Sequence, residues 1–288
     1  MKLRICGLVF IFTGFLSSLG SAETPIERGS YLVNTIGACG NCHGRDASGR
    51  NLYRDNTLAG GFVFDEIEPE LGHVIAPNIT PDPDTGIGKW SEADIVVALR
   101  DGKRADGSII GPPMPIPVYR QLSDQDATAI AVYLLSKPPV RDSLQKSQYK
   151  VPLAADYGPP VTHVEAPSPA DKATYGGYLV TVGHCVLCHT PPGDDKPFNM
   201  DLAFAGGRSF PTFSGLPATV SRNITSDPDH GLGKWSDNDI KNAITKAVRP
   251  DGTKLTGPMP YGWYAKITPG DLDSIVAFMR TINPVKNQ

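Results

Sequence analysis

The sequence predicts a mainly α-helical fold made of two similar tandem domains, on three observations. A stretch that begins Asn78-Ile79-Thr80 and ends Trp90-Ser91 returns 145 residues later, beginning Asn223-Ile224-Thr225 and ending Trp235-Ser236. Helix-start signals recur with it, and 30 glycines and 27 prolines indicate many turns between short helices. A repeat this long, present twice, indicates duplicated globular domains rather than a solenoid.

Each domain is expected to open with a helix, make a long excursion rich in Gly and Pro, form a short middle helix and close with a helix after a Pro-rich loop. Short hairpins are expected in the excursions, near Gly60-Gly61 and Gly206-Gly207. The helix starts are predicted from Ser or Thr three positions before an acidic residue. These patterns occur at Thr24–Glu27 and Ser168–Asp171, at Ser91–Asp94 and Ser236–Asp239, and at Ser123–Asp126 and Thr268–Asp271.

Residues 1–22 have the pattern of a secretory signal peptide. Lys2 and Arg4 precede an apolar run, and Gly20-Ser21-Ala22 supplies small residues for cleavage before Glu23. A buried N-terminal helix or an uncleaved anchor is the alternative, but the run is short for a membrane span. No later stretch is long enough to cross a bilayer. We therefore expect export to the periplasm, either free or peripheral at the inner membrane.

The mature chain is expected to divide into a first domain at 23–140, a Pro-rich connector at 141–167 and a second domain at 168–288. The composition of the connector favours an extended, stiff segment. A formal net charge of −3 argues against a general nucleic-acid binder. Cys6 is removed with the signal peptide, and the four remaining cysteines are too few and too clustered for a disulfide scaffold.

These four cysteines form two motifs, Cys39-Gly40-Asn41-Cys42-His43 and Cys185-Val186-Leu187-Cys188-His189. The spacing C-x-x-C-H is that of covalent c-type haem attachment. Two thiols so spaced can form thioethers to the two vinyl groups of one porphyrin, and the adjacent histidine can offer a ring nitrogen to the iron. A zinc ribbon needs its Cys pairs much closer together, and a thioredoxin-like dithiol leaves the histidine unexplained. The sequence thus predicts two covalent haem c groups, attached at Cys39, Cys42, Cys185 and Cys188, with His43 and His189 as iron ligands.

A sixth iron ligand is predicted in a Pro-rich loop of each domain. Met114 lies in Gly111-Pro112-Pro113-Met114-Pro115 and Met259 in Gly257-Pro258-Met259-Pro260. A thioether is a soft, neutral donor, and flanking prolines restrict the loop that carries it. A loop methionine that merely packs on the core is the alternative, and recurrence at the same repeat position favours the ligand.

Two further pairs recur and are candidates for the haem pockets. Trp90 and Trp235 either pack as ordinary core aromatics or lie against a haem edge with the indole N–H near a propionate. Asn78 and Asn223 either brace the pocket or make a turn.

The remaining histidines of the mature chain are expected to be solvated loop side chains rather than ligands. His184 precedes the second C-x-x-C-H motif, while His73, His163 and His230 fall in the excursions or the connector. His73 and His230 are the reserve ligands if either methionine does not bind iron.

At these residues the chain resembles class I cytochrome c domains, and more narrowly the multihaem cytochrome c subunits of bacterial membrane-associated alcohol, aldehyde and gluconate dehydrogenases. C-x-x-C-H is common to all c-type cytochromes, whereas the stretch from Asn78 to Ser91, its copy, and the Pro-Met-Pro loops narrow the resemblance. It covers nearly the whole mature chain and implies a helical cytochrome c fold wrapped around each haem, with His/Met ligation. That family usually has three haem domains and a C-terminal membrane-binding segment, whereas two domains are recognised in this sequence.

The expected function is one-electron transfer, because imidazole and thioether together leave no position on the iron for substrate. The resemblance implies a dehydrogenase as electron donor and a terminal oxidase, the quinone pool or another cytochrome as acceptor. A dihaem enzyme of the peroxidase or thiosulfate dehydrogenase type is the alternative. Such an enzyme needs one haem with a replaceable sixth ligand, and the matching patterns of the two copies count against it.

Overall fold

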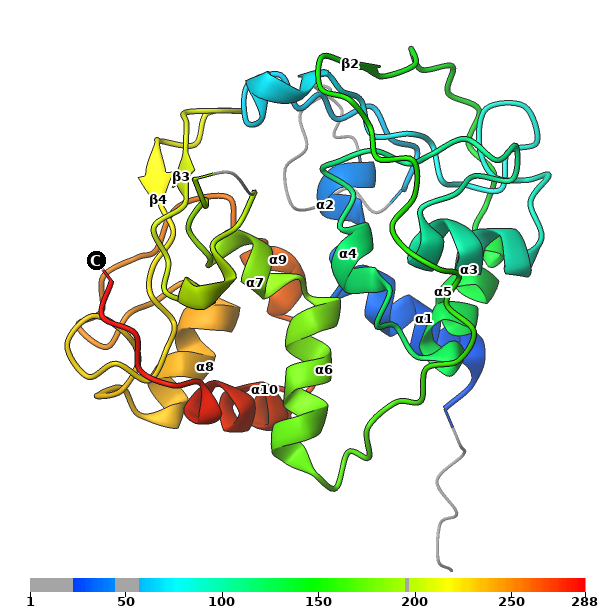
Figure 1. Cartoon of the computed structure of the whole chain (residues 1–288). Coiled ribbons are helices and arrows are strands. Elements are labelled where there is room, and N and C mark those ends of the chain that lie inside the picture. Colours follow the sequence, from blue (N-terminus) through cyan, green and yellow to red (C-terminus); the bar gives the residue numbers. More distant parts are fainter. Residues whose placement is uncertain (1–22, 45–56, 195–196, 288) are drawn as a thin grey trace, which may run out of the picture.

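The computed structural model describes residues 23–44, 57–194 and 197–287. The predicted signal peptide, residues 1–22, lies outside the described residues. In the described part the chain is mainly helical, and the helices form two halves with the same order of elements (Figure 1). We refer to residues 23–140 as the N-terminal half, 141–167 as the connector and 168–287 as the C-terminal half.

The bounds of the elements follow the chain. The helices of the N-terminal half are α1 (Pro25–Asn34), α2 (Gly40–His43), α3 (Glu92–Asp101), α4 (Ile116–Tyr119) and α5 (Asp124–Ser136). Those of the C-terminal half are α6 (Lys172–Val182), α7 (Cys185–Cys188), α8 (Asp237–Lys246), α9 (Tyr261–Tyr264) and α10 (Pro269–Thr281). The short remaining elements are the 3-10 turns η1 (Pro69–Leu71) and η2 (Met200–Leu202), and the strands β1 (Gly72–His73), β2 (Gln148–Tyr149), β3 (Ser209–Phe210) and β4 (Thr219–Val220).

Most predicted helix starts are confirmed. The side chains of Thr24, Ser91 and Ser236 each accept a backbone N–H in the first turn of α1, α3 and α8, and the acidic residue at the third helical position completes a capping box. Ser123 and Thr268 cap α5 and α10 in the same way. There the acidic residue does not return to the cap, and its other contacts are described below.

The predicted start of α6 at Ser168 is wrong by about one turn. The helix begins at Lys172, and the carboxylate of Asp171 accepts the N–H of Thr174 at 3.2 Å. Ser168 instead forms a turn, in which its carbonyl accepts the N–H of Asp171 at 3.0 Å. A carboxylate is favoured at the positive end of a helix, so Asp171 takes the cap position.

Each half is built on a close crossing of its first and last helices, α1 with α5 and α6 with α10. A Cβ atom on Gly29 would overlap the carbonyl oxygen of Ala129, and one on Gly176 would overlap that of Ser274. Glycine at the crossing therefore allows the helix backbones to touch. The fully buried Leu32 follows in α1, and its counterpart in α6 is as deeply buried.

The hairpin predicted near Gly206-Gly207 is present as the antiparallel pair β3 and β4. The excursion of the N-terminal half differs. Near Gly60-Gly61 the chain makes a single antiparallel bridge between Val63 and Ile75, and β1 pairs with β2 of the connector. The excursion therefore completes its pairing with a segment that follows the last helix of its own half.

The connector lies along the surface of the N-terminal half. The hydroxyl of Tyr157 donates to the carbonyl of Ile110 at 2.7 Å, and the N–H of Val161 donates to the carboxylate of Asp101 at 3.0 Å. The connector is thus bonded to the N-terminal half at several points, and it passes the start of α5, where the carbonyl of Val164 accepts the N–H of Asp124 at 2.8 Å, before it reaches α6 (Figure 1).

One apolar core runs through both halves, because buried residues of α1, α5, α6 and α10 belong to a single cluster. α4 of the N-terminal half packs against α6 of the C-terminal half. Of the helices in the described ranges, none has the length and apolar character needed to span a membrane.

Candidate functional site

The two C-x-x-C-H motifs occupy equivalent places in the halves. Cys39 and Cys42 lie at and within α2, and Cys185 and Cys188 are the ends of α7, so each thiol pair is spaced over one helical turn. All four are free of disulfides in the described structure. The turn directs both thiols of a pair to one side, as two attachments to a single porphyrin require.

The imidazoles of the two motifs share one hydrogen-bond arrangement. His43 Nδ1 lies 2.9 Å from the carbonyl oxygen of Pro77, and His189 Nδ1 lies 2.7 Å from that of Arg222. A carbonyl can only accept, so Nδ1 carries the proton and the lone pair of Nε2 is available for a metal. Burial lowers the pKa of both histidines, which favours the neutral form that binds iron.

Each of these carbonyls precedes a buried asparagine. Asn78 accepts the backbone N–H and the hydroxyl of Thr80 at 2.9 and 2.8 Å. Its amide donates to the hydroxyl of Thr85 at 3.1 Å and to the carbonyl of Val140 at 2.7 Å. All of the hydrogen bonds of the side chain are thus made to protein groups, and they fix the loop whose preceding carbonyl, that of Pro77, orients His43.

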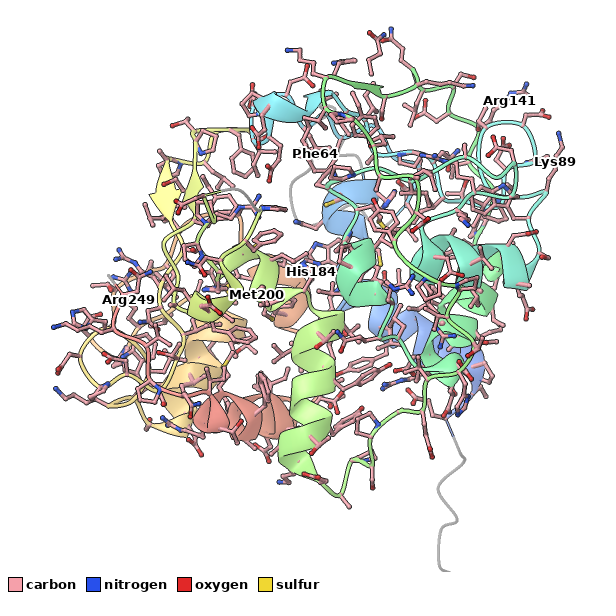
Figure 2. All side chains as sticks on the ribbon, viewed as in Figure 1. Phe64, Lys89, Arg141, His184, Met200 and Arg249 are labelled. Carbon is pink, nitrogen blue, oxygen red and sulfur yellow. The ribbon has the colours of Figure 1, made fainter. Side chains whose placement is uncertain are left out.

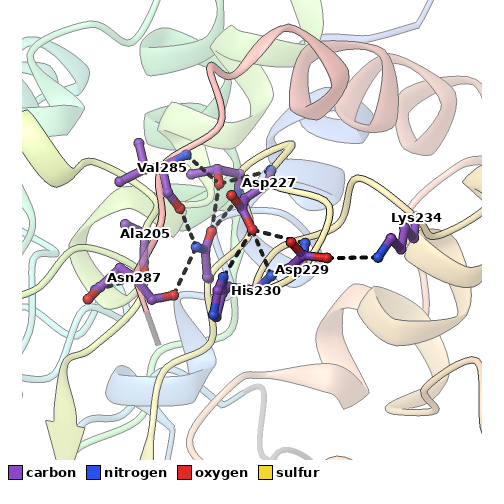
Figure 3. Close-up of polar contacts among 9 residues, drawn as sticks. Ala205, Asp227, Asp229, His230, Lys234, Val285 and Asn287 are labelled. Carbon is purple, nitrogen blue, oxygen red and sulfur yellow. Dashed lines mark hydrogen bonds and ion pairs between the residues drawn. The ribbon is translucent and has the colours of Figure 1, made fainter.

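Asn223 fixes the equivalent loop of the C-terminal half, where Figure 3 shows Val285 and Asn287 beside Asp227 and His230. It accepts the N–H and hydroxyl of Thr225 at 2.9 and 2.7 Å and donates to the carbonyls of Val285 at 2.7 Å and Asn287 at 3.1 Å. The next turn of the loop is held by Asp227, which accepts the N–H of His230 at 2.7 Å. The residues after α10 thus accept from the asparagine amide as Val140 does in the other half.

Both methionines and both recurring tryptophans line the shared core. Met114, Met259, Trp90 and Trp235 are partly buried and pack against it, as do Cys39 and Cys185. The loop of each methionine turns sharply into the next short helix, since the methionine carbonyl accepts the N–H two residues on at 2.8 or 2.9 Å. The methionine, the tryptophan and the first cysteine of each half therefore pack against one apolar core, whereas Cys42 packs against a smaller cluster that contains Phe64.

Burial raises the pKa of Cys39, Cys42 and Cys185 to about 12, and it also raises the pKa of Cys188. A redox-active dithiol has the opposite property, a lowered thiol pKa in a polar or cationic environment. An apolar setting suits sulfur that ends as an uncharged thioether.

His184 does not match the expectation of a solvated loop histidine. Figure 2 places it between α7 and α4, where its ring packs edge-on against that of Tyr119 at a centroid distance of 6.3 Å. Burial lowers the pKa of His184, and the backbone of Gly37 in the opposite half has a smaller opposing effect. The sequence alone gives no signal for this role, because the repeat has Ala38 at the corresponding position.

The other three histidines each pair with a carboxylate. His73 Nδ1 lies 2.8 Å from Asp65, His163 Nδ1 lies 2.6 Å from Asp124, and the ring of His230 lies 3.2 Å from the same Asp227 that holds its N–H. None of these contacts places a histidine beside the loop of Met114 or Met259. They therefore do not support His73 or His230 as an iron ligand.

Sequence reasoning missed three aromatic residues of the site. Tyr119 and Tyr264 are buried repeat equivalents, and both belong to the apolar core against which Cys39 and Cys185 pack. Their recurrence, 145 residues apart, was a usable signal. Trp263 has no such cue, because Val118 replaces it in the N-terminal half.

Trp263 is 2% exposed, and its indole N–H is buried without a partner in the described structure. An unmade hydrogen bond of a buried donor is costly, so an acceptor on a bound group would satisfy it. α9 carries Trp263 directly after the Met259 loop. This orphan donor, the paired thiols, the oriented imidazole and the neighbouring thioether together fit a covalently held haem.

Comparison with known proteins agrees with this fit. The cytochrome c family model matches residues 26–138. The chain is 31% identical to the cytochrome c subunit of a quinone-dependent alcohol dehydrogenase of Gluconacetobacter polyoxogenes, over 94% of this chain and 60% of that protein. It is 31% identical to the gluconate 2-dehydrogenase cytochrome c subunit of Pantoea cypripedii, over 82% of this chain and 54% of that protein.

A third relative is a diheme cytochrome c-type protein of Cereibacter sphaeroides, 29% identical over 77% of this chain and 74% of that protein. The chain spans little more than half the length of the two dehydrogenase subunits. Residues 26–138 thus belong to the cytochrome c family, which implies covalently bound haem c, and the chain as a whole is similar to the cytochrome c subunits of alcohol and gluconate dehydrogenases.

Proposed function

We propose that this chain is a periplasmic dihaem cytochrome that passes single electrons from a dehydrogenase to the respiratory chain. Two tandem cytochrome c domains, 23–140 and 168–288, each hold one haem c. The first is attached at Cys39 and Cys42 with His43 and Met114 as ligands. The second is attached at Cys185 and Cys188 with His189 and Met259 as ligands.

The observation that carries the proposal is the duplicated orientation of the two histidines. Each donates from Nδ1 to the carbonyl that precedes a buried asparagine, which leaves Nε2 of His43 and of His189 for iron. Bound haem supplies reversible one-electron chemistry. The residues of the chain attach and orient it and exclude water, and a thioether ligand raises its potential.

The partners follow from the relatives named as dehydrogenase subunits. We infer a periplasmic or membrane-associated dehydrogenase as donor and a terminal oxidase, the quinone pool or another cytochrome as acceptor. The identity of the donor is tested by recovering the tagged full-length chain from periplasm and identifying a dehydrogenase that copurifies and reduces it.

A pyridine haemochrome assay on the purified chain, combined with the methionine–iron charge-transfer band, tests the haems themselves. Two haems per chain, both low-spin with the methionine band and both inert to carbon monoxide, are expected. One haem that lacks the band and binds carbon monoxide readily would favour the dihaem enzyme. Absence of covalent haem would overturn both.

A further inference from the structure

The hydroxyl of Tyr31 joins the two halves. It lies on α1 of the N-terminal half and donates to the carboxylate of Asp271 on α10 at 2.6 Å. The N–H of Thr268, the residue that caps α10, donates to the same hydroxyl at 3.1 Å. The side chain of Tyr31 thus bonds to the start of the closing helix of the opposite half.

Tyr178, the repeat equivalent of Tyr31, makes the reciprocal contact. It lies on α6 and donates to the carboxylate of Asp126 on α5 at 2.6 Å. The N–H of Ser123, the cap of α5, donates to its hydroxyl at 3.2 Å. The equivalent tyrosine of each half therefore binds the start of the closing helix of the other half.

Repeat equivalents also meet each other along this boundary. Arg28 Nη2 lies 3.4 Å from the hydroxyl of Tyr175, and these residues hold matching places on α1 and α6. Tyr119 and Tyr264, matching residues of α4 and α9, both belong to the core cluster that the two halves share. Contact between a residue and its own equivalent is the mark of a two-fold arrangement, so the halves face each other about a local pseudo-two-fold axis.

The bond between tyrosine and carboxylate replaces the bond that would complete a capping box at the start of α5 and α10. In α3 and α8 the acidic residue at the third position, Asp94 or Asp239, bonds back to the cap. In α5 and α10 the corresponding carboxylates, Asp126 and Asp271, accept instead from the tyrosine of the other half, and Asp126 also forms an ion pair with Arg28 of its own half at 2.8 Å. The acidic residues of these two cap motifs thus serve the junction between the halves, while Ser123 and Thr268 still cap their own helices.

The junction brings the haem-attachment segments, residues 36–43 and 183–189, together. A Cβ on Gly183 would lie 3.5 Å from the side chain of Ile36, and the ring of His184 packs against that of Tyr119 of the N-terminal half. α1 and α6, which carry the two tyrosines, lead directly into these segments.

We propose that Tyr31 and Tyr178 are positioning residues that hold the two attachment segments in contact, so that the two haems keep one fixed mutual orientation. The statement about haems rests on the proposed function, whereas the contact between segments rests on the hydrogen bonds above. The paired bonds make the dihaem chain one rigid unit rather than two carriers on a tether.

The test uses the full-length haem-loaded chain with Tyr31→Phe, Tyr178→Phe and both together. Two nearby haems couple their Soret transitions, and the resulting circular dichroism couplet depends on their mutual orientation. Urea titrations follow this couplet beside the far-ultraviolet helical signal, which reports the folding of each half. Each lost hydroxyl–carboxylate bond is expected to lower the docking constant roughly tenfold, so in the double variant the couplet disappears at lower urea than the helical signal.

Tyr133→Phe is the matched control, because that hydroxyl accepts from Asn34 at 2.8 Å within the N-terminal half. It is expected to leave the couplet and the helical signal coincident, as in the wild type. A double variant whose two signals remain coincident at the wild-type midpoint overturns the inference, as does a wild-type chain with two haems and no couplet.

Fewer than two haems in the haemochrome assay would defeat the proposed function but not the contact. The radius of gyration from small-angle scattering then measures the separation of the halves in the same urea series. Expansion of the double variant before helix loss supports the role of Tyr31 and Tyr178, and expansion that coincides with helix loss in all variants overturns it.

Discussion

His43 Nδ1 lies 2.9 Å from the carbonyl oxygen of Pro77, and the adjacent Asn78 anchors that carbonyl through the loop. A backbone carbonyl cannot be removed by substitution. The sensitive side chain is therefore the asparagine, which contacts the histidine only through the main chain.

Asn78→Ala is expected to lower the free energy of unfolding by about 3 kcal/mol, since it leaves several buried partners unsatisfied. Urea unfolding of the haem-loaded chain measures the change. Asn238→Ala, at an exposed position of α8, is the control and should stay within about 0.5 kcal/mol of the wild type. Equal effects of the two changes would contradict the bracing role.

Gly176→Ala should destabilise the protein by about 1–3 kcal/mol, because the new methyl group overlaps the carbonyl of Ser274 where α6 crosses α10. Gly270→Ala places a methyl group on the first turn of α10 with nothing within 4 Å. It should be neutral or stabilising by up to about 1 kcal/mol. Thermal unfolding of both variants compares them, and a harmless Gly176→Ala would refute the close crossing.

Met114→Leu is expected to lower the reduction potential of the first haem and open its iron to carbon monoxide, because leucine has no donor atom. Redox titration and carbon monoxide binding measure these changes. Met200→Leu, at a methionine that is 59% exposed, should leave both readouts unchanged. If the potential and the ligand binding of Met114→Leu equal those of the wild type, Met114 is not a ligand.

Acid should weaken the attachment of the connector at Asp124. This carboxylate bonds to Arg100 at 2.7 Å, His163 at 2.6 Å and the N–H of Val164 at 3.2 Å. Its pKa is lowered to about 2, chiefly by the hydrogen bond from Arg100 and next by that from His163. A lowered pKa in the folded state means that the stabilisation is fully present above the ordinary value of 3.8 and is lost as the pH falls towards 2.

The stability difference between the wild type and Asp124→Asn should therefore shrink as the pH is lowered from about 5 to about 2. Urea unfolding across this range measures it. Asp156→Asn, an exposed connector position, provides the comparison. A stability difference that grows as the pH falls would show that the direction assigned to the pKa shift of Asp124 is wrong, and with it the assigned partners.

Local patterns in the sequence predicted local structure well. The caps at Thr24, Ser91 and Ser236 involve residues three positions apart, so a short window contains all of their chemistry. The contact of Tyr31 with Asp271 spans 240 residues, and no local pattern encodes it. The recurrence of the tyrosine was visible in the repeat, but its partner was not, because the acidic residue also fits a capping box.

The same limit applies to the site. The cysteines, histidines and methionines recur with fixed spacing and could be assigned as candidates from the sequence. His184 and Trp263 could not, since the other half has Ala38 and Val118 at these places. Their positions depend on how the halves pack, which is a property of the tertiary structure.

The connector has a practical consequence for dividing the protein. Its β2 completes a sheet with β1, and residues as late as Val164 bond to α5. A recombinant fragment ended at residue 140 would lose these ties and expose the edge of β1. An N-terminal fragment intended for separate expression should extend to Pro167, and the position for an engineered protease site lies between there and Lys172.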